Sequence, residues 1–432
     1  MTMKKILMVL CLMGTGLFPL SAQVETADSL QISLQEAIQE ALAHNELLKK
    51  AAARTKAGQA ALEQAEGELL PKIDANFSYG YLDIVPGSKI VVLGNSRHDL
   101  FPTVSLSQPL YTGGKLKHAK QAAAAEVQSL EQAFLSEQLN LNLAVTLDYF
   151  LLQSLQNQQQ ILLENRKQLE TQQRYARLLV EAGRMSQLEL DRISVAIATT
   201  DGNVLKIQDD YQAVSYELCL MLGRKRSQLL LPQDSLQVIP FDRSLETLMP
   251  TALEHNPVWK QLEFDLRNAE AKVNIQQAAW LPQVSAQAYY GYEFGPESFS
   301  LDKNKRYFWG LNVKMPLYDG NVIGAKIDES KAGLEQVQWQ REYVRKNLAT
   351  QVQNSYARLK EKEQQIAIQQ HAVKQASQSY RLGMIEYHAG RRSNTDLLDI
   401  QKSLLNSQLT LDEATLEYNI ARARLLAVMG IL

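Results

Sequence analysis

Pro109-Leu110-Tyr111-Thr112-Gly113 is matched 207 residues later by Pro316-Leu317-Tyr318-Asp319-Gly320. Nearer the N-terminus, Ala41-Leu42-Ala43-His44-Asn45 is matched by Ala252-Leu253-Glu254-His255-Asn256 at an offset of 211. Matches that keep the same order along the chain indicate a duplicated structural unit. The offset falls from 211 to 207 between these two matches. The two copies therefore differ by four residues in a loop that lies between them.

Each copy combines alternating strands with very long helices. Residues 72–85 alternate apolar and polar side chains, and residues 103–111 do so again. This pattern predicts two strands, each with one apolar and one polar face. Residues 115–182 contain neither glycine nor proline and place apolar side chains three, four or seven apart. A helix of that length measures about 100 Å and has no globular core to wrap, so we expect it to pack as a coiled coil.

The predicted fold is mainly α-helical with a small β part. We expect a signal peptide at 1–22, a first structural repeat at 23–223, a connector at 224–244 and a second repeat at 245–432. Each repeat is predicted to contain a helix (34–70 and 245–281), a β-hairpin (72–111 and 283–318), a long helix (115–182 and 322–389) and a shorter helix (186–222 and 392–429). The helices at 34–70 and 186–222 together match one long helix in length, so we expect them to be stacked end to end beside it.

The N-terminus predicts export. Lys4 and Lys5 precede an apolar run over residues 6–20, and Ala22 offers a small residue for cleavage. No later stretch of about 20 apolar residues predicts a transmembrane helix. Cys219 is the one cysteine outside the signal peptide and lies in an apolar stretch, which predicts a buried, unreactive thiol. The near-neutral formal charge of −2 gives no indication of nucleic-acid binding.

Four strands with an aromatic-rich apolar face and a polar face are typical of an outer-membrane barrel. Four strands cannot close a barrel, and open strand edges are not tolerated in lipid. This interpretation therefore requires several copies, with eight strands in a dimer or twelve in a trimer. The side chains predicted to face lipid are Phe77, Tyr79, Tyr81, Tyr290, Tyr292, Tyr307 and Trp309.

The sequence resembles the TolC-like outer-membrane efflux proteins over nearly all of its mature length. The resemblance is carried by the duplicated plan, by residues 108–114 and 315–320, which close the hairpins, and by residues 175–191 and 387–405. It implies a homotrimer in the outer membrane of a Gram-negative bacterium, with a twelve-stranded barrel and a periplasmic helical barrel. It also implies a passive exit duct for drugs, metals or secreted proteins, as in multidrug export or type I secretion. The implied partners are a periplasmic adaptor protein and an inner-membrane transporter of the RND or ABC type.

The turns that follow the long helices are the predicted gate. Gly183 and Gly390 permit the left-handed backbone that reverses a helix. Charged side chains surround both glycines and could form ion pairs that close the duct, or contact the adaptor; inward-facing acidic rings are a further possibility. The alternative is a solvated turn with helix-capping charges. The residues in this prediction are Glu181, Gly183, Arg184, Gly390, Arg391, Arg392, Asp396 and Asp399.

The sequence gives no indication of an enzyme. It contains no nucleophile–base arrangement, glycine-rich phosphate loop or zinc spacing, so we expect no catalytic, cofactor or metal site. His44 and His255 are equivalent in the two copies and fit helix-end packing better than metal binding. Two other functions stay open at this point: a periplasmic coiled-coil scaffold or adaptor without a membrane barrel, and a secreted hydrolase on a helical frame.

Overall fold

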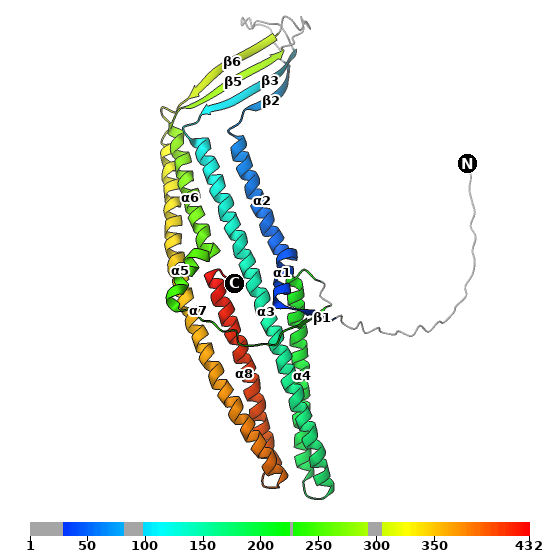
Figure 1. Cartoon of the computed structure of the whole chain (residues 1–432). Coiled ribbons are helices and arrows are strands. Elements are labelled where there is room, and N and C mark those ends of the chain that lie inside the picture. The colour runs from blue at the N-terminus through cyan, green and yellow to red at the C-terminus, as the bar shows by residue number, and fades with distance from the viewer. Residues whose placement is uncertain (1–28, 82–97, 225–227, 293–304) are drawn as a thin grey trace, which may run out of the picture.

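The structure is a computed structural model and describes residues 29–81, 98–224, 228–292 and 305–432. Figure 1 shows an elongated molecule with a sheet at one end and helices that run away from it. The predicted signal peptide at 1–22 lies outside the described residues. Among the helices in the described ranges, none is long and apolar enough to cross a membrane.

The elements follow the duplicated plan. The first repeat contains α1 (Leu34–His44), α2 (Glu46–Gly67), β2 (Lys72–Tyr81), β3 (His98–Tyr111), α3 (Lys115–Glu181) and α4 (Gln187–Met221). The second contains α5 (Leu245–His255), α6 (Pro257–Gln277), the short 3₁₀-helix η1 (Ala278–Trp280), β5 (Gln283–Tyr292), β6 (Lys305–Lys314), α7 (Val322–His388) and α8 (Asn394–Met429). Two further strands, β1 (Ser29–Ile32) and β4 (Leu229–Pro232), pair outside the main sheet.

The two hairpins form one antiparallel sheet in the order β2-β3-β5-β6. The central pairing of β3 with β5 joins the repeats and sets Val104 opposite Tyr290. Pairing within the hairpins sets Ala75 opposite Val104 and Tyr290 opposite Tyr307. Because side chains on paired strands share a face at each register position, the apolar positions of all four strands lie on one side of the sheet.

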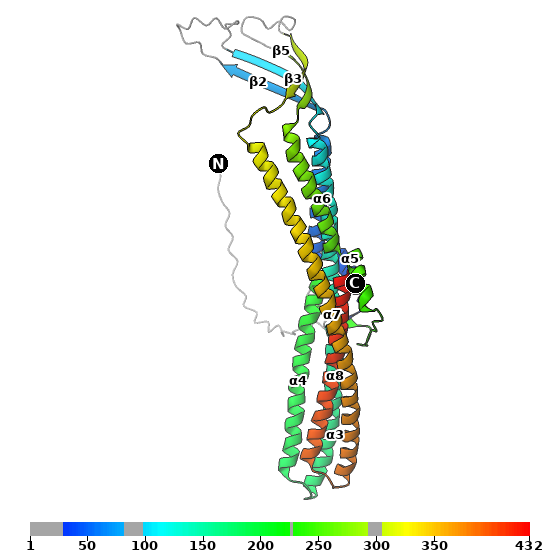
Figure 2. The same ribbon diagram turned by 90° about the vertical axis from the view of Figure 1, so that its left-hand side faces the viewer.

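The helices stack end to end as the lengths of 34–70 and 186–222 predict. In Figure 1, α2 and α4 follow one another along α3, and in Figures 1 and 2, α6 and α8 follow one another along α7. The two repeats lie side by side, with α3 packed against both α6 and α8.

The predictions of single helices at 34–70 and 245–281 are wrong in one respect. Each segment breaks at an asparagine, Asn45 or Asn256, whose backbone is extended. The Asn45 side chain accepts hydrogen bonds from the amides of Leu47 and Leu48 and so begins a new helix. In the second repeat Pro257 follows the break and occupies the first turn of α6, where its missing amide proton costs nothing.

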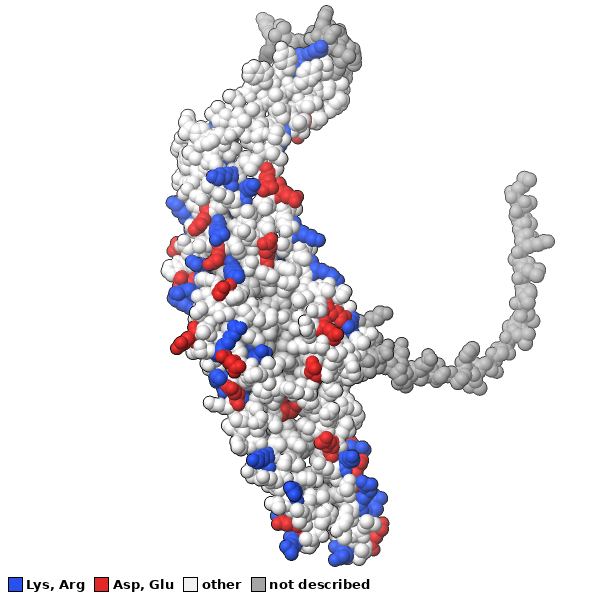
Figure 3. Space-filling view, in the orientation of Figure 1, with Lys and Arg blue, Asp and Glu red and all other residues white. Residues whose placement is uncertain are grey.

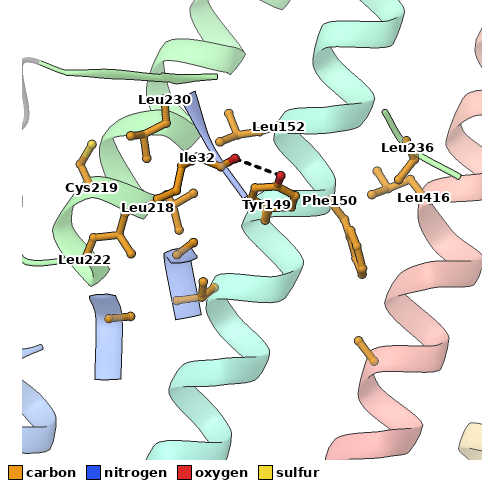
Figure 4. Packing of buried hydrophobic residues seen from close by; sticks show 14 residues of the cluster. Ile32, Tyr149, Phe150, Leu152, Leu218, Cys219, Leu222, Leu230, Leu236 and Leu416 are labelled. Carbon is orange, nitrogen blue, oxygen red and sulfur yellow. Dashed lines mark hydrogen bonds between the residues drawn. The ribbon is translucent and has the colours of Figure 1, made fainter. Parts of the chain in front are cut away.

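The connector predicted at 224–244 contains a short strand. Leu229–Pro232 forms β4, which pairs in parallel with β1. The two strands cover a hydrophobic cluster at mid-height of the helices, shown in Figure 4. There the hydroxyl of Tyr149 on α3 donates to the carbonyl of Ile32 across 3.1 Å. Cys219 is buried in this cluster as predicted, and burial raises the pKa of its thiol.

Candidate functional site

The main sheet exposes its apolar face. Phe77 is 71% exposed, Tyr307 is 75% exposed and Trp309 is 81% exposed. Tyr79 and Tyr290 are exposed too, and Tyr292 is half-buried, with its hydroxyl 2.8 Å from that of Tyr290. A soluble protein rarely leaves such a continuous apolar surface uncovered. Six of the seven predicted lipid-facing side chains therefore lie on this face, and the side chain of Tyr81 lies outside the described part of the structure.

The opposite face of the sheet is mostly polar. It carries Asp74 and Asn76 on β2, Thr103, Ser105 and Ser107 on β3, Gln287 on β5 and Asn312 on β6. This face also holds Phe101, Tyr289 and Phe308, and the apolar–polar alternation of the sequence did not predict the pair formed by Tyr289 and Phe308. Their rings are stacked, with centroids 5.7 Å apart and planes inclined by 25°. Figure 3 shows that Lys, Arg, Asp and Glu are sparse at the sheet end and mixed in sign along the helices.

The second candidate region is the pair of turns at the far end of the helices. Gly183 and Gly390 have φ angles of +69° and +70°, as their predicted role requires. The amides after each glycine turn back onto the helix, since Arg184 donates to Leu179 and Arg391 donates to Glu386. A side chain at Gly183 or Gly390 would meet no atom within 4 Å, so the backbone angle alone explains these glycines.

The predicted charges at these turns do not form a single cluster in one chain. Arg392 pairs with Glu386 of α7, with Nη2 2.6 Å from Oε2. Glu181, Arg184 and Arg391 are exposed and form no ion pair with other described residues. On α8, Asp396 and Asp399 are exposed and three positions apart, which places them on one face of the helix. The amide of Asp396 donates to Ser393 at the helix start.

Neutral amides, which sequence analysis missed, connect the two helical hairpins near the turns. Asn394 is only 3% exposed at the start of α8. Its Oδ1 accepts from Gln172 Nε2 of α3 across 2.8 Å, and its Nδ2 donates to the carbonyl of Glu189 across 3.1 Å. Arg192 of α4 also donates to the hydroxyl of Thr395. Asn394 thus holds α8 to both helices of the other hairpin.

A buried tyrosine completes the turn region. Tyr387 lies at the end of α7, and its ring meets that of Tyr175 on α3 edge-on, with centroids 5.9 Å apart. Its hydroxyl has no hydrogen-bond partner among the described residues, and burial raises its pKa to about 12. An unpaired buried hydroxyl is costly, so a rearrangement that exposes Tyr387 to water would recover part of that cost.

Higher on the helices, a buried carboxylate joins the repeats. Asp412 of α8 accepts hydrogen bonds from Ser154 across 2.5 Å and from Asn157 and Gln158 of α3 across 3.2 Å each. Burial raises the pKa of Asp412, and the three hydrogen bonds oppose that rise. Because all three donors are uncharged, this contact fixes the geometry of α3 against α8 without an ion pair.

The histidines take the structural position expected for them. His44 and His255 each end a helix, with Nδ1 3.2 Å from the Glu40 carbonyl and 3.1 Å from the Thr251 carbonyl, respectively. No group of three or more His, Cys, Asp or Glu side chains suited to a metal ion occurs within the described ranges.

Comparison with known proteins identifies a family. The family model described as "Outer membrane efflux protein" matches residues 37–224 and 248–431. Nodulation protein T of Rhizobium leguminosarum bv. trifolii is 22% identical over 256 residues, which span 58% of this chain and 53% of that protein. The chain thus spans about half the length of that relative. Outer membrane protein TolC of Salmonella enteritidis is 22% identical over an alignment that covers all of this chain and 87% of TolC.

Solved structures share the fold. The crystal structure of the outer membrane protein VceC from Vibrio cholerae superposes with a TM-score of 0.81 at 19% sequence identity. The superposition covers 92% of this chain and 96% of VceC. The paired long helices, the four-stranded sheet and their duplication are therefore a known arrangement.

Proposed function

Because the chain belongs to the outer membrane efflux protein family, we propose that three copies of it assemble into one exit duct with a gate at the helix turns. The protein is an outer-membrane efflux channel with a periplasmic extension, and its family consists of transport proteins without enzymatic activity. Channels of this family are trimers that work with adaptor proteins and inner-membrane pumps. The trimer, the gate and the partners of this particular chain are the proposal.

The exposed apolar face of the sheet is the observation that carries this proposal. In the described residues, β2 and β6 each pair with a neighbour on one side only. Their free edges would leave backbone groups unsatisfied in lipid. Three copies that pair β6 with β2 of the next copy would close a twelve-stranded barrel, with the apolar face toward lipid and the polar face around water.

The helices support the same assembly. Outer helices α4 and α7 each expose apolar side chains that nothing in one chain covers: Leu188, Val195 and Leu205 on α4, and Trp339, Tyr343 and Ile368 on α7. These helices lie at opposite edges of the helical layer in Figure 1. In a ring of three copies, α7 of one copy meets α4 of the next in the half near the turns and α2 of the next in the half near the sheet, and these apolar surfaces become buried.

The gate follows from the contacts at the turns. The bonds from Asn394 to Gln172 and Glu189, and from Arg192 to Thr395, hold the α7–α8 hairpin against the α3–α4 hairpin. We propose that opening breaks these bonds and moves α7–α8 outward. Asp396 and Asp399 then line the entrance in three copies, and the exposed Glu181, Arg184 and Arg391 are available to the adaptor.

A spin-label experiment tests the orientation of the sheet. Trp309→Cys and Asn312→Cys occupy opposite faces of β6, and each is labelled with a nitroxide in the protein reconstituted into bilayers. We expect the label at position 309 to collide with oxygen dissolved in lipid and the label at position 312 to collide with a water-soluble nickel complex. Equal access of the nickel complex to both labels would contradict the barrel. The buried thiol of Cys219 serves as the unlabelled background.

A further inference from the structure

The polar face of the sheet holds three aromatic residues that a water-filled bore does not require, Phe101 on β3, Tyr289 on β5 and Phe308 on β6, and the last two are neighbours. Tyr289 and Phe308 occupy opposite positions on the adjacent strands β5 and β6. Along each strand they alternate with Tyr290, Tyr307 and Trp309 of the apolar face, so they point to the other side. Barrel interiors are polar, and this pair departs from that pattern.

The two rings stack against one another nearly in parallel. Their centroids are 5.7 Å apart and their planes are inclined by only 25°. Gly310, two residues after Phe308 on the same face, makes this possible. A Cβ atom at Gly310 would lie 2.7 Å from Cζ of Phe308, which is closer than such atoms can approach. The absent side chain therefore lets the phenyl ring lie along the sheet rather than project from it.

In a single chain both rings remain accessible on the polar face. Phe308 remains 49% exposed and Tyr289 37% exposed. The next positions in the same row are Ser105 on β3 and Asp74 on β2, and neither of these side chains is large enough to cover a ring. The part of this ring pair that stays exposed is a surface on which another planar π-system can stack.

We propose that Tyr289 and Phe308 form an aromatic platform in the channel bore that binds planar aromatic molecules by stacking. The proposal rests on the barrel assembly, because that assembly turns the polar face toward the bore. Three copies then place three platforms around one passage. The platform would slow planar aromatic solutes in transit relative to saturated solutes of the same size and charge.

Channel block in a planar bilayer tests the platform. The probes are naphthalene-2-sulfonate and decahydronaphthalene-2-sulfonate, which share charge and approximate size but differ in their π-system. In the wild-type channel we expect naphthalene-2-sulfonate to block current at a severalfold lower concentration. Replacing one ring, as in Phe308→Leu, should raise its half-blocking concentration about threefold, and the Tyr289→Leu/Phe308→Leu double variant should raise it about tenfold. Leu311→Ala, on the apolar face of β6, should leave it unchanged.

Gly310→Ala provides a second variant that keeps both rings. Its methyl group displaces the Phe308 ring from the sheet, so we expect it to weaken block by naphthalene-2-sulfonate about as much as Phe308→Leu does. Equal block by the two probes in the wild-type channel, or block that is unchanged in the double variant, would overturn the platform and leave the channel standing. A wild-type protein that forms no conducting pores would instead contradict the channel itself, and the platform with it.

Discussion

Asn45 donates a hydrogen bond from Nδ2 to the carbonyl of Met221 across 3.1 Å and so ties the break between α1 and α2 to the last turn of α4. Asn256 makes the equivalent bond to the carbonyl of Val428 across 2.9 Å in the second repeat. The same side chains begin α2 and α6 through their Oδ1 atoms. One residue type thus joins the two stacked helices of each repeat into a single rod.

Two substitutions of Asn45 distinguish its role as a helix cap from its hydrogen bond to Met221. Asn45→Ala loses the helix cap and the bond to Met221, and we expect the stability to fall by about 2 kcal/mol. Asn45→Asp keeps the cap acceptor and loses the donor, so about half of that loss should remain. Thermal unfolding followed by circular dichroism measures the stability loss of each variant. The alanine and aspartate variants of Asn256 test the equivalent site of the second repeat in the same way. Equal stability of Asn45→Asp and the wild type would show that the bond to Met221 contributes nothing.

The glycines that end α8 and α7 should respond differently to alanine. Both have positive φ angles, so each substitution introduces the same backbone strain of about 1 kcal/mol. A Cβ atom at Gly430 would also lie 2.6 Å from the carbonyl oxygen of His255, whereas at Gly390 it would meet nothing. We therefore expect Gly430→Ala to lower the unfolding temperature clearly more than Gly390→Ala. An equal fall in unfolding temperature for both variants would mean that Gly430 does not pack against the carbonyl of His255.

Asp148 gives the stability a pH dependence. Burial on α3, with a smaller contribution from Glu217, raises the pKa of its carboxyl to about 6. Because the folded state binds this proton more tightly than the unfolded state, lowering the pH from 7.5 through 6 adds stability from this group. Above pH 6 the ionised carboxylate is a cost, and Asp148→Asn removes it.

The comparison of Asp148→Asn with the wild type isolates that effect. At pH 7.5 the variant should unfold about 1–2 °C higher, and the difference should shrink toward pH 5. Glu217→Gln should shift the same profile less, since burial is the larger cause. A difference that grows as the pH falls would reverse the assigned direction of the pKa shift.

The contacts of Asn394 predict how the gate responds to mutation. Asn394→Ala removes its bonds to Gln172 and to the Glu189 carbonyl, so the two hairpins should separate more easily and single-channel conductance should rise. Gln187 occupies the equivalent position in the first repeat but bonds only to Asp191 of its own helix. Gln187→Ala is therefore the matched control and should leave conductance unchanged. A rise of the same size in both variants would indicate general loosening of the turns.

The sequence predicts the elements well where one pattern runs for many residues. The period-three-and-four pattern of residues 115–182 ends within a residue of α3, and the alternation around Phe77 and Tyr79 gives the correct face of β2. The break at Asn45 could not be seen, because helical periodicity continues from Ala41 and Leu42 to Leu48 across it. It is enforced by tertiary contact, since Gly223 at the end of α4 abuts His44.

The site was harder to predict than the fold. The sequence predicted charged contacts at the turns, but the contacts between the hairpins are made largely by the uncharged Gln172 and Asn394. No periodic pattern marks such amides, because their partners are more than 200 positions away. The stacked pair of Tyr289 and Phe308 was missed because a single aromatic residue on a polar face does not change the alternation.

Mass determination combined with conductance distinguishes a trimeric channel closed at its helix turns from a soluble scaffold. The mature protein is purified from outer membranes in detergent, its mass is determined by light scattering, and it is inserted into a planar bilayer. We expect a trimer that gives small, gated current steps, which grow when Asp396 and Asp399 are both replaced by alanine. A monomer or dimer that is soluble without detergent and carries no current would contradict the trimeric channel and would favour the periplasmic scaffold.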